Sequence, residues 1–263
     1  MGTKKKKSKQ SAKSWKIGSV FFKVVLWFFI VTVGITILYR WINPPITPLM
    51  ISRKLFHDAT ITKKWTNIEN ISPYLIKASI ASEDNRFLAH NGFDFSAIQK
   101  AINERKNGVR KRGASTISQQ TAKNVFLTPH QSWIRKGFEV YFTILIELFW
   151  SKERIMEVYL NVIEFGDGLY GCEAASNYYF HTSANKLTQR QAALMVACYP
   201  NPRKRNPSKP TTYLNNRANS IINLIPKLGK IDFDKETIVA AEKRYENQEE
   251  KRIKKNGGKR IQL

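Results

Sequence analysis

Residues 82–94 read SEDNRFLAHNGFD, and this stretch decides how the rest of the chain is interpreted. Glu83, Phe87 and His90 are spaced i, i+4 and i+7, which would place a carboxylate, an aromatic ring and an imidazole on one helix face. A core helix would carry Leu, Ile or Val there, and a surface helix has no packing reason to select these types. The pattern therefore predicts a helix that contributes to a functional site.

A second segment, GASTISQQTAKN at residues 113–124, has the same character. Thr116, Gln120 and Lys123 repeat the helical spacing, and Asn124 lies beside them. The threonine is followed three residues later by a glutamine, which is the sequence pattern of a capping box. We therefore expect a helix to begin here and to present amide, hydroxyl and ammonium groups to the same site.

The composition limits the architecture. With 263 residues and 42% hydrophobic content, the chain can form one sizeable domain with a core, and a second large catalytic domain would not fit. The net charge of +24 indicates an anionic partner, but charge alone does not separate nucleic acid, anionic lipid and phosphorylated substrates. Cys172 and Cys198 are too few for a disulfide framework, and small buried thiols are expected; whether they pair stays open.

A membrane anchor is predicted near the N-terminus. Seven lysines lie within residues 4–16, and residues 17–39 then form an apolar stretch interrupted only by Lys23. At roughly 1.5 Å per residue this stretch can cross a hydrocarbon core of about 30 Å. Aromatic and β-branched residues on every face argue against a buried soluble helix, and the length and the lack of an A-x-A site argue against a cleaved signal peptide.

The lysines also predict the topology. The positive-inside rule keeps the Lys-rich end in the cytoplasm and sends residues after about 42 across the cytoplasmic (inner) membrane. The protein is therefore expected to be single-pass, with a cytoplasmic N-terminus and an extracytoplasmic main domain. Because anionic headgroups explain a poly-Lys arm beside a span, no nucleic-acid partner is expected.

The rest of the chain is predicted to be mainly helical, without convincing strands. Ser72 and Pro73 are expected to open one helix. Further helices are indicated at about 132–149, 151–161, 170–180, 188–198 and 212–228. We divide the chain into a basic cytoplasmic arm at 1–16, a transmembrane anchor at 17–39, a connector at 40–70, a globular domain at 71–229 and a charged tail at 230–263.

Two neighbouring stretches are unusually apolar. Residues 132–150 are interpreted as a central core helix, with membrane contact as the alternative. The preceding stretch at 125–134 places Phe126, Leu127 and Trp133 around a proline-containing loop. This loop suits a lobe that dips into the membrane interface.

Four motifs occur in order along the chain. They are Glu83-Asp84-x-x-Phe87-x-x-His90-x-Gly92, Gly113-x-Ser115-Thr116-Ile117-x-Gln119-Gln120-x-x-Lys123-Asn124, Arg135-Lys136-x-x-Glu139 and Glu157-x-Tyr159-Leu160-Asn161. They resemble the motifs of the peptidoglycan glycosyltransferases, glycosyltransferase family 51, over roughly residues 70–210. The short length, the anchor and the lack of a transpeptidase domain resemble the monofunctional biosynthetic peptidoglycan transglycosylases rather than the bifunctional class A penicillin-binding proteins.

The resemblance implies a lysozyme-like helical domain with a small membrane-proximal jaw lobe, which polymerises lipid II into glycan strands. Glu83 would be the general base that takes the proton from the acceptor sugar's 4-hydroxyl as this oxygen attacks the donor's anomeric carbon. The reaction would invert that carbon and release undecaprenyl diphosphate. Glu139 would be the second essential carboxylate, acting through a divalent cation (Mg or Mn) or through neighbouring cations; no organic cofactor is expected.

The other motif residues suit the same chemistry. Lys123, Arg135 and Lys136 supply fixed positive charge for a departing diphosphate. Uncharged side chains suited to binding sugar hydroxyls, amides or phosphate oxygens are Thr116, Gln119, Gln120 and Asn124. Residues expected to support Glu83 rather than to react are Asp84, Phe87, His90 and Ser115. Structural roles are expected for Glu157, Tyr159 and Asn161.

Two other functions stay open on the sequence alone. A glycoside hydrolase could use two carboxylates, although cations have no use beside a neutral leaving group. A membrane-anchored scaffold that binds glycan without catalysis would also retain part of the motifs. The expected partners are lipid II, the growing lipid-linked glycan and membrane lipids, and partners among cell-wall synthesis or division proteins stay open.

Overall fold

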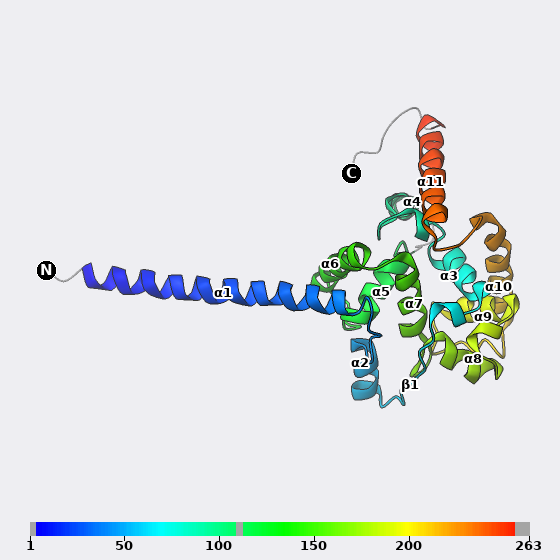
Figure 1. Cartoon of the computed structure of the whole chain (residues 1–263), viewed down its shortest axis with the longest axis horizontal. Coiled ribbons are helices and arrows are strands. Elements are labelled where there is room, and N and C mark those ends of the chain that lie inside the picture. The colour runs from blue at the N-terminus through cyan, green and yellow to red at the C-terminus, as the bar shows by residue number, and fades with distance from the viewer. Residues whose placement is uncertain (1–3, 109–112, 256–263) are drawn as a thin grey trace. The chain divides into compact units, whose positions relative to one another are not determined.

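The structure, a computed structural model, describes residues 4–108 and 113–255 and divides into two compact units, Met1–Asn43 and Pro44–Leu263. The first unit contains helix α1 (Lys4–Leu38), drawn in blue in Figure 1. Within it, Gly18–Leu38 is long and apolar enough to cross a membrane, with a mean hydropathy of 2.4. Of the predicted arm and tail, residues 1–3 and 256–263 lie outside the described residues.

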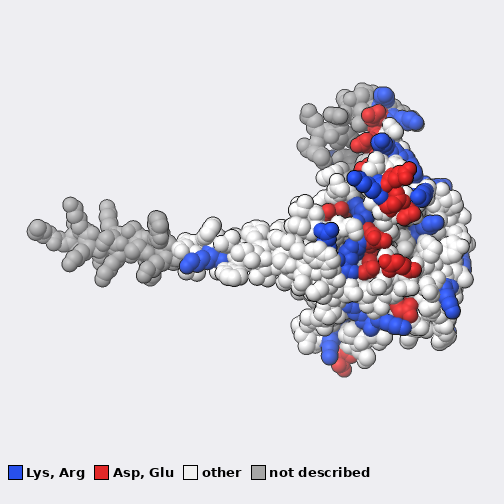
Figure 2. Space-filling view, in the orientation of Figure 1, with Lys and Arg blue, Asp and Glu red and all other residues white. Residues whose placement is uncertain are grey.

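Two threonine hydroxyl groups of α1 donate to carbonyl groups within the helix. Thr32 Oγ1 donates to the Phe28 carbonyl at 2.8 Å, and Thr36 Oγ1 donates to the Thr32 carbonyl at 2.8 Å. A hydroxyl in hydrocarbon has no water to bond, so this back-bonding suits a spanning helix. Figure 2 shows the described surface of α1 as almost free of charged side chains.

The core of the second unit is built around helix α7 (Lys152–Val162), whose side chains Ile155, Met156, Val158 and Leu160 are fully buried. Helix α5 (Ile117–Phe126) packs against α7 and against α6 (Trp133–Phe149). On the other side of the unit, α3 (Pro73–Glu83) packs against α9 (Gln189–Cys198) and α10 (Thr212–Leu224) (Figure 1). The remaining α-helices are α2 (Pro48–His57), α4 (Phe95–Lys106), α8 (Cys172–Phe180) and α11 (Lys235–Lys255).

Most predicted helices are confirmed to within a few residues, and their starts follow the expected capping signals. Ser72 accepts a hydrogen bond from the Tyr74 N–H at the start of α3, directly before Pro73. The helix predicted at 212–228 is divided into α10 and a 3₁₀ turn, η4 (Ile225–Leu228), because Pro226 has no N–H to continue the α-helical ladder. The other 3₁₀ turns are η1 (Ile68–Asn70), η2 (Phe87–Ala89) and η3 (Ala184–Lys186).

The prediction that strands are absent was wrong. A small sheet in the order β1-β3-β2 joins β1 (Thr62–Lys63), β3 (Leu169–Tyr170) and β2 (Glu164–Gly166). β1 pairs in parallel and β2 antiparallel with β3. Strands of two or three residues are too short to produce the alternating pattern by which strands are recognised in a sequence.

The range expected to be a connector, 40–70, contains helix α2. Thr47 caps it by accepting from the Met50 N–H, and Pro48 occupies its first turn, where no hydrogen bond is lost. Arg53 of α2 forms an ion pair with Glu164 of β2 at 3.1 Å, and α2 packs against α5. Part of the range expected to be a connector is therefore a helix that starts at Pro48.

Helix α6 is not the central core helix that its composition suggested. Glu139, Phe142, Thr143, Leu145 and Ile146 are buried. The opposite side of the helix carries large apolar side chains that are exposed, with Ile134 at 76%, Ile144 at 52% and Leu148 at 70%. The apolar residues of α6 therefore serve two surfaces, and the central position belongs to α7.

Cys172 and Cys198 are buried free thiols.

Asn161 joins α7 to the segment before α3. Its Oδ1 accepts from the Thr66 N–H at 2.9 Å, and its Nδ2 donates to the Thr66 and Glu157 carbonyls at 2.8 Å each. Asn161→Ala leaves these buried groups unpaired, so the free energy of unfolding should fall by roughly 2–3 kcal/mol. Urea denaturation measures the change.

The matched control is Asn216→Ala on the exposed side of α10, which should alter the free energy of unfolding by less than about 0.5 kcal/mol. Equal denaturation midpoints for the two variants would contradict the role of Asn161.

Candidate active site

The first motif does not form one continuous helix, as its spacing suggested. Helix α3 ends at Glu83, Asp84 is its C-terminal cap with φ −161°, Phe87 begins η2, and His90 is extended. The Phe87 N–H donates to the Asp84 carbonyl at 3.0 Å, which closes a turn immediately after Glu83. Glu83, Phe87 and His90 therefore do not share a helix face, and the expectation that they do was wrong.

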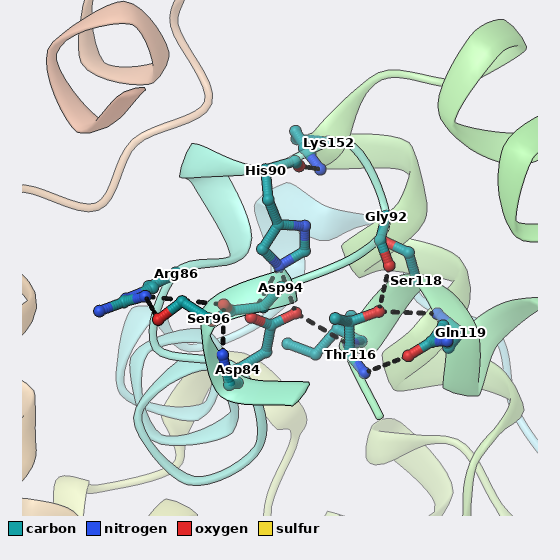
Figure 3. Close-up of polar contacts among 12 residues, drawn as sticks. Asp84, Arg86, His90, Gly92, Asp94, Ser96, Thr116, Ser118, Gln119 and Lys152 are labelled. Carbon is teal, nitrogen blue, oxygen red and sulfur yellow. Dashed lines mark hydrogen bonds and ion pairs between the residues drawn. The ribbon is translucent and has the colours of Figure 1, made fainter. Parts of the chain in front are cut away.

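The physical reason is the buried side chain of Asp84, which binds groups distant in the sequence (Figure 3). His90 Nε2 lies 2.9 and 3.1 Å from its two oxygens, and the Ile117 N–H donates to Oδ2 at 3.0 Å. Ile117 is the first residue of α5. The turn after Glu83 thus allows one carboxylate to bind both the end of the first motif and the start of the second.

Helix α5 begins with the predicted capping box. The Gln119 N–H donates to Thr116 Oγ1 at 3.1 Å, and the Thr116 N–H donates to Gln119 Oε1 at 3.0 Å. Thr116 Oγ1 also donates to the Gly92 carbonyl at 2.7 Å (Figure 3). These bonds hold the two motifs together, and substrate binding by Thr116 and Gln119 stays a prediction.

Gly92 is the point at which the first motif approaches α6. Its φ is +86°, and a Cβ atom there would lie 2.8 Å from Thr143 Cγ2 and 3.0 Å from Glu147 Cγ. Only glycine fits both the backbone conformation and the space. Glu147 accepts from the Lys152 ammonium at 2.9 Å and from the Ser118 hydroxyl, so this carboxylate joins α5, α6 and α7. Sequence reasoning missed it.

Glu83 lies at the C-terminal end of α3, where its side chain is partly exposed. Gln120 Nε2 donates to Oε2 at 3.1 Å, and Ser82 Oγ donates to Oε1 at 3.0 Å. The guanidinium of Arg217, on α10, lies 4.0 Å from Oε1 and donates to Ser82 Oγ at 3.3 Å. Arg217 was also missed, because it comes from a helix more than a hundred residues away with no local signal.

Gln120 is itself oriented by the core. The hydroxyl of the fully buried Tyr159 lies 3.4 Å from Gln120 Oε1. Burial raises the pKa of Tyr159 well above its ordinary value, so the phenol stays protonated and donates. The expected structural role of the fourth motif agrees with this contact, and with the bond from the Ile68 N–H to Glu157 at 3.0 Å.

A cationic cluster, Lys123, Arg135 and Lys136, surrounds the second carboxylate. Glu139 is 3% exposed, and it pairs with Arg135 Nη1 at 2.9 Å and with the Lys136 ammonium. Lys123, on α5, has no hydrogen-bond partner for its ammonium among residues 4–108 and 113–255. Burial lowers the pKa of Lys123. The charges of Arg135 and Lys136 lower it further, whereas the charges of Glu139 and Glu83 raise it. Three cations and one carboxylate leave two net positive charges here.

The residues fit a divalent cation poorly. Both oxygens of Glu139 are already bound by cations. Within the part of the chain that the structure describes, no group of three or more His, Cys, Asp or Glu side chains is arranged to hold a metal ion. Oxygen-rich coordination is what Mg²⁺ and Mn²⁺ require. The fixed cations of the cluster are the groups available to meet negative charge.

Two further predicted residues are neighbours of these groups along the chain. Asn124 is buried on α5, one residue after Lys123, and Ser115 is exposed directly before the start of that helix. The site therefore offers a carboxylate that can take a proton and a cluster of cations that can stabilise a leaving anion. Such a pair suits displacement of a phosphate-type group by a hydroxyl.

Comparison with known proteins supports this interpretation of the site. The family model described as Transglycosylase matches residues 52–225. A "Biosynthetic peptidoglycan transglycosylase" of Bacteroides thetaiotaomicron is 53% identical over 217 residues, covering 80% of this chain and 88% of the relative. Relatives of the same name from Bdellovibrio bacteriovorus and Caulobacter vibrioides are 49% identical over 221 residues and 52% identical over 185 residues. They cover 82% and 70% of this chain, and 86% and 80% of the respective relatives.

The geometry predicts unequal changes in the free energy of unfolding when two adjacent acidic residues are replaced. Asp84→Ala leaves His90 and the Ile117 N–H without their buried acceptor, so the free energy of unfolding should fall by roughly 3 kcal/mol. Glu83→Gln, in the partly exposed site, should change it by less than about 1 kcal/mol. Denaturant titration of both variants checks the difference, and equal losses would contradict the assigned role of Asp84.

Proposed function

The chain belongs to the transglycosylase family, and we propose that Glu83 and the cationic cluster divide between them the work of joining two glycan units. The protein is a peptidoglycan glycosyltransferase that polymerises glycan in cell-wall synthesis. Its mainly helical fold is that of a lysozyme-like transglycosylase domain. Its substrates are lipid II and the growing lipid-linked glycan, as the family implies.

Glu83 is the general base of this proposal. Its carboxylate takes the proton from the 4-hydroxyl of the lipid II acceptor as that oxygen forms a bond to the anomeric carbon of the growing strand. Gln120, Ser82 and Arg217 hold the carboxylate oxygens in place. The bond from the anomeric carbon to the lipid diphosphate breaks on the opposite face, which inverts the carbon.

The cationic cluster acts on the departing diphosphate. Lys123 has donors free of protein partners among the described residues, and its burial strengthens any electrostatic interaction it makes. Arg135 and Lys136 are held by Glu139, so they meet the diphosphate without having to reorganise. Glu139 thereby acts through these cations. Asn124, within α5, is proposed to bind sugar or phosphate oxygens, and Ser115, before the start of α5, to support the site.

The single observation that carries this mechanism is the surplus of cations beside a carboxylate base. A hydrolase that cleaves a neutral glycosidic bond has no use for three cations at its leaving group, and it needs a water where the acceptor sugar would bind. A scaffold without catalysis does not require a partly exposed carboxylate with three donors around it. Polymerisation accounts for both features.

The N-terminal apolar helix is long and apolar enough to be a membrane anchor. We propose that it crosses the cytoplasmic membrane once, with the Lys-rich end inside and the catalytic unit outside. The exposed apolar side of α6, together with Leu55 and Phe56 of α2, supports a further contact of the catalytic unit with lipid, because both helices pack against α5. This surface corresponds to the expected jaw lobe.

Glu83→Gln removes the base while keeping its shape. With lipid II in detergent, kcat for polymer formation should fall roughly 10²–10⁴-fold. Gel analysis of glycan products gives the rate, and circular dichroism verifies the fold. The control is Glu236→Gln, an exposed carboxylate on α11 that should leave the rate unchanged. Polymer made by Glu83→Gln at the wild-type rate would remove Glu83 from the mechanism.

The α6 surface predicts membrane affinity without the anchor. Residues 44–263 should co-sediment with anionic phospholipid vesicles, and Leu148→Ser should weaken the partitioning roughly tenfold, because one large apolar side chain loses its burial in lipid. Val239→Ser, on exposed α11, is the control that should not change it. A catalytic unit that stays wholly in solution would contradict lipid contact by this surface.

A further inference from the structure

Helix α11 lies beyond the residues that the family model matches, yet it contacts the first motif. The matched region ends at residue 225, and α11 spans Lys235–Lys255. It packs against η2, the turn that follows Glu83, and it stands as a separate rod above the unit in Figure 1. The face of α11 visible in Figure 2 carries both acidic and basic side chains.

The contact is made through Arg86, three residues after Glu83. The Arg86 guanidinium lies 4.6 Å from the centre of the Tyr245 ring, and its Nη1 lies 3.4 Å from Glu249 Oε1. Tyr245 and Glu249 are one helical turn apart on α11, so both face the same guanidinium. A cation held between a ring and a carboxylate is restricted in position.

Arg86 also holds the start of α4. Its Nη1 donates to Ser96 Oγ at 2.6 Å and lies 3.6 Å from Asp94 Oδ1 (Figure 3). Asp94 in turn caps α4 by accepting from the Ala97 N–H at 2.8 Å. The Arg86 guanidinium therefore connects the turn after Glu83 with α4 and α11.

A second contact holds the middle of α11 to the end of η4. Arg244 Nη1 donates to the Leu228 carbonyl at 2.8 Å. Arg244 Nη1 also lies close to Gly229, whose φ is +78°. A Cβ atom at Gly229 would be 2.3 Å from this nitrogen. Between α11 and the back of α3 remains a cavity of about 270 Å³, lined by Ile80, Leu88 and Tyr245 among others. The polar contacts to Arg86 connect α11 with the turn after Glu83 beside this cavity.

We propose that α11 is a positioning element of the active site, in which Tyr245 and Glu249 fix Arg86 and thereby the turn that carries Glu83. This inference rests on the proposed function of Glu83. Asp84 holds the turn to α5 from one side, and Arg86 holds it to α4 and α11 from the other. Without the contacts of Arg86 to α4 and α11, the carboxylate of Glu83 shifts relative to the acceptor hydroxyl. Small displacements of a reacting group lower the rate strongly.

A positioning role and a structural role differ in what they change. Arg86 and Glu249 are each 25% exposed at the side chain, and ion pairs of this kind contribute little to global stability. Neither Tyr245 nor Glu249 is proposed to touch substrate. We therefore expect their loss to lower kcat while KM for lipid II and the melting temperature stay close to the wild-type values.

The test uses the full-length protein in detergent with lipid II, with kcat, KM and melting temperature measured for each variant. Tyr245→Ala and Glu249→Gln should each lower kcat roughly tenfold. Tyr245→Phe keeps the ring and should restore the rate. Glu246→Gln removes the same charge from an exposed position of the same helix and should match the wild-type protein.

Wild-type kcat in both Tyr245→Ala and Glu249→Gln would overturn the inference. It would equally be overturned if Tyr245→Phe were as slow as Tyr245→Ala, or if the loss appeared in KM alone. A wild-type protein that forms no polymer would instead overturn the proposed function, and this inference with it.

Discussion

The buried carboxylate of Asp84 is the constraint on which the active site depends. It ends α3 directly after Glu83, binds the imidazole of His90, and accepts the first free N–H of α5. A buried carboxylate without such donors would be strongly destabilising, so its partners are held as firmly as it is. Through it, two motifs separated by more than twenty residues are fixed to each other, and Glu83 is brought to the side of α5 that carries Gln120 and Lys123.

The site separates its charges by burial as well as by position. Glu83 remains partly open, where a hydroxyl can reach it, whereas Glu139 is closed off between two cations. A carboxylate in the first setting is suited to accept a proton, and one in the second is suited to hold cations in place. The same residue type thus suits two tasks in one site because its surroundings differ.

Sequence patterns among neighbouring residues correctly predicted the helix starts and ranges that local contacts determine. The Thr116 capping box, the Ser72-Pro73 start of α3 and most helix ranges depend on neighbouring residues and were confirmed. The single helix through Glu83 and His90 was wrong, because Asp84 bonds to distant groups that outweigh the local helical pattern. Arg217, Glu147 and Arg86 enter the site or its support through contacts made only in the folded chain. The prediction for α6 was wrong because composition alone does not distinguish an exposed apolar face from a buried one.

We propose that this site forms glycosidic bonds by displacing a lipid diphosphate. The most direct measurement is the ratio of undecaprenyl diphosphate released to glycosidic bonds formed when the wild-type protein is incubated with lipid II. We expect one diphosphate for each new bond, in products that lengthen with time. Shortening of a preformed glycan strand without diphosphate release would contradict it.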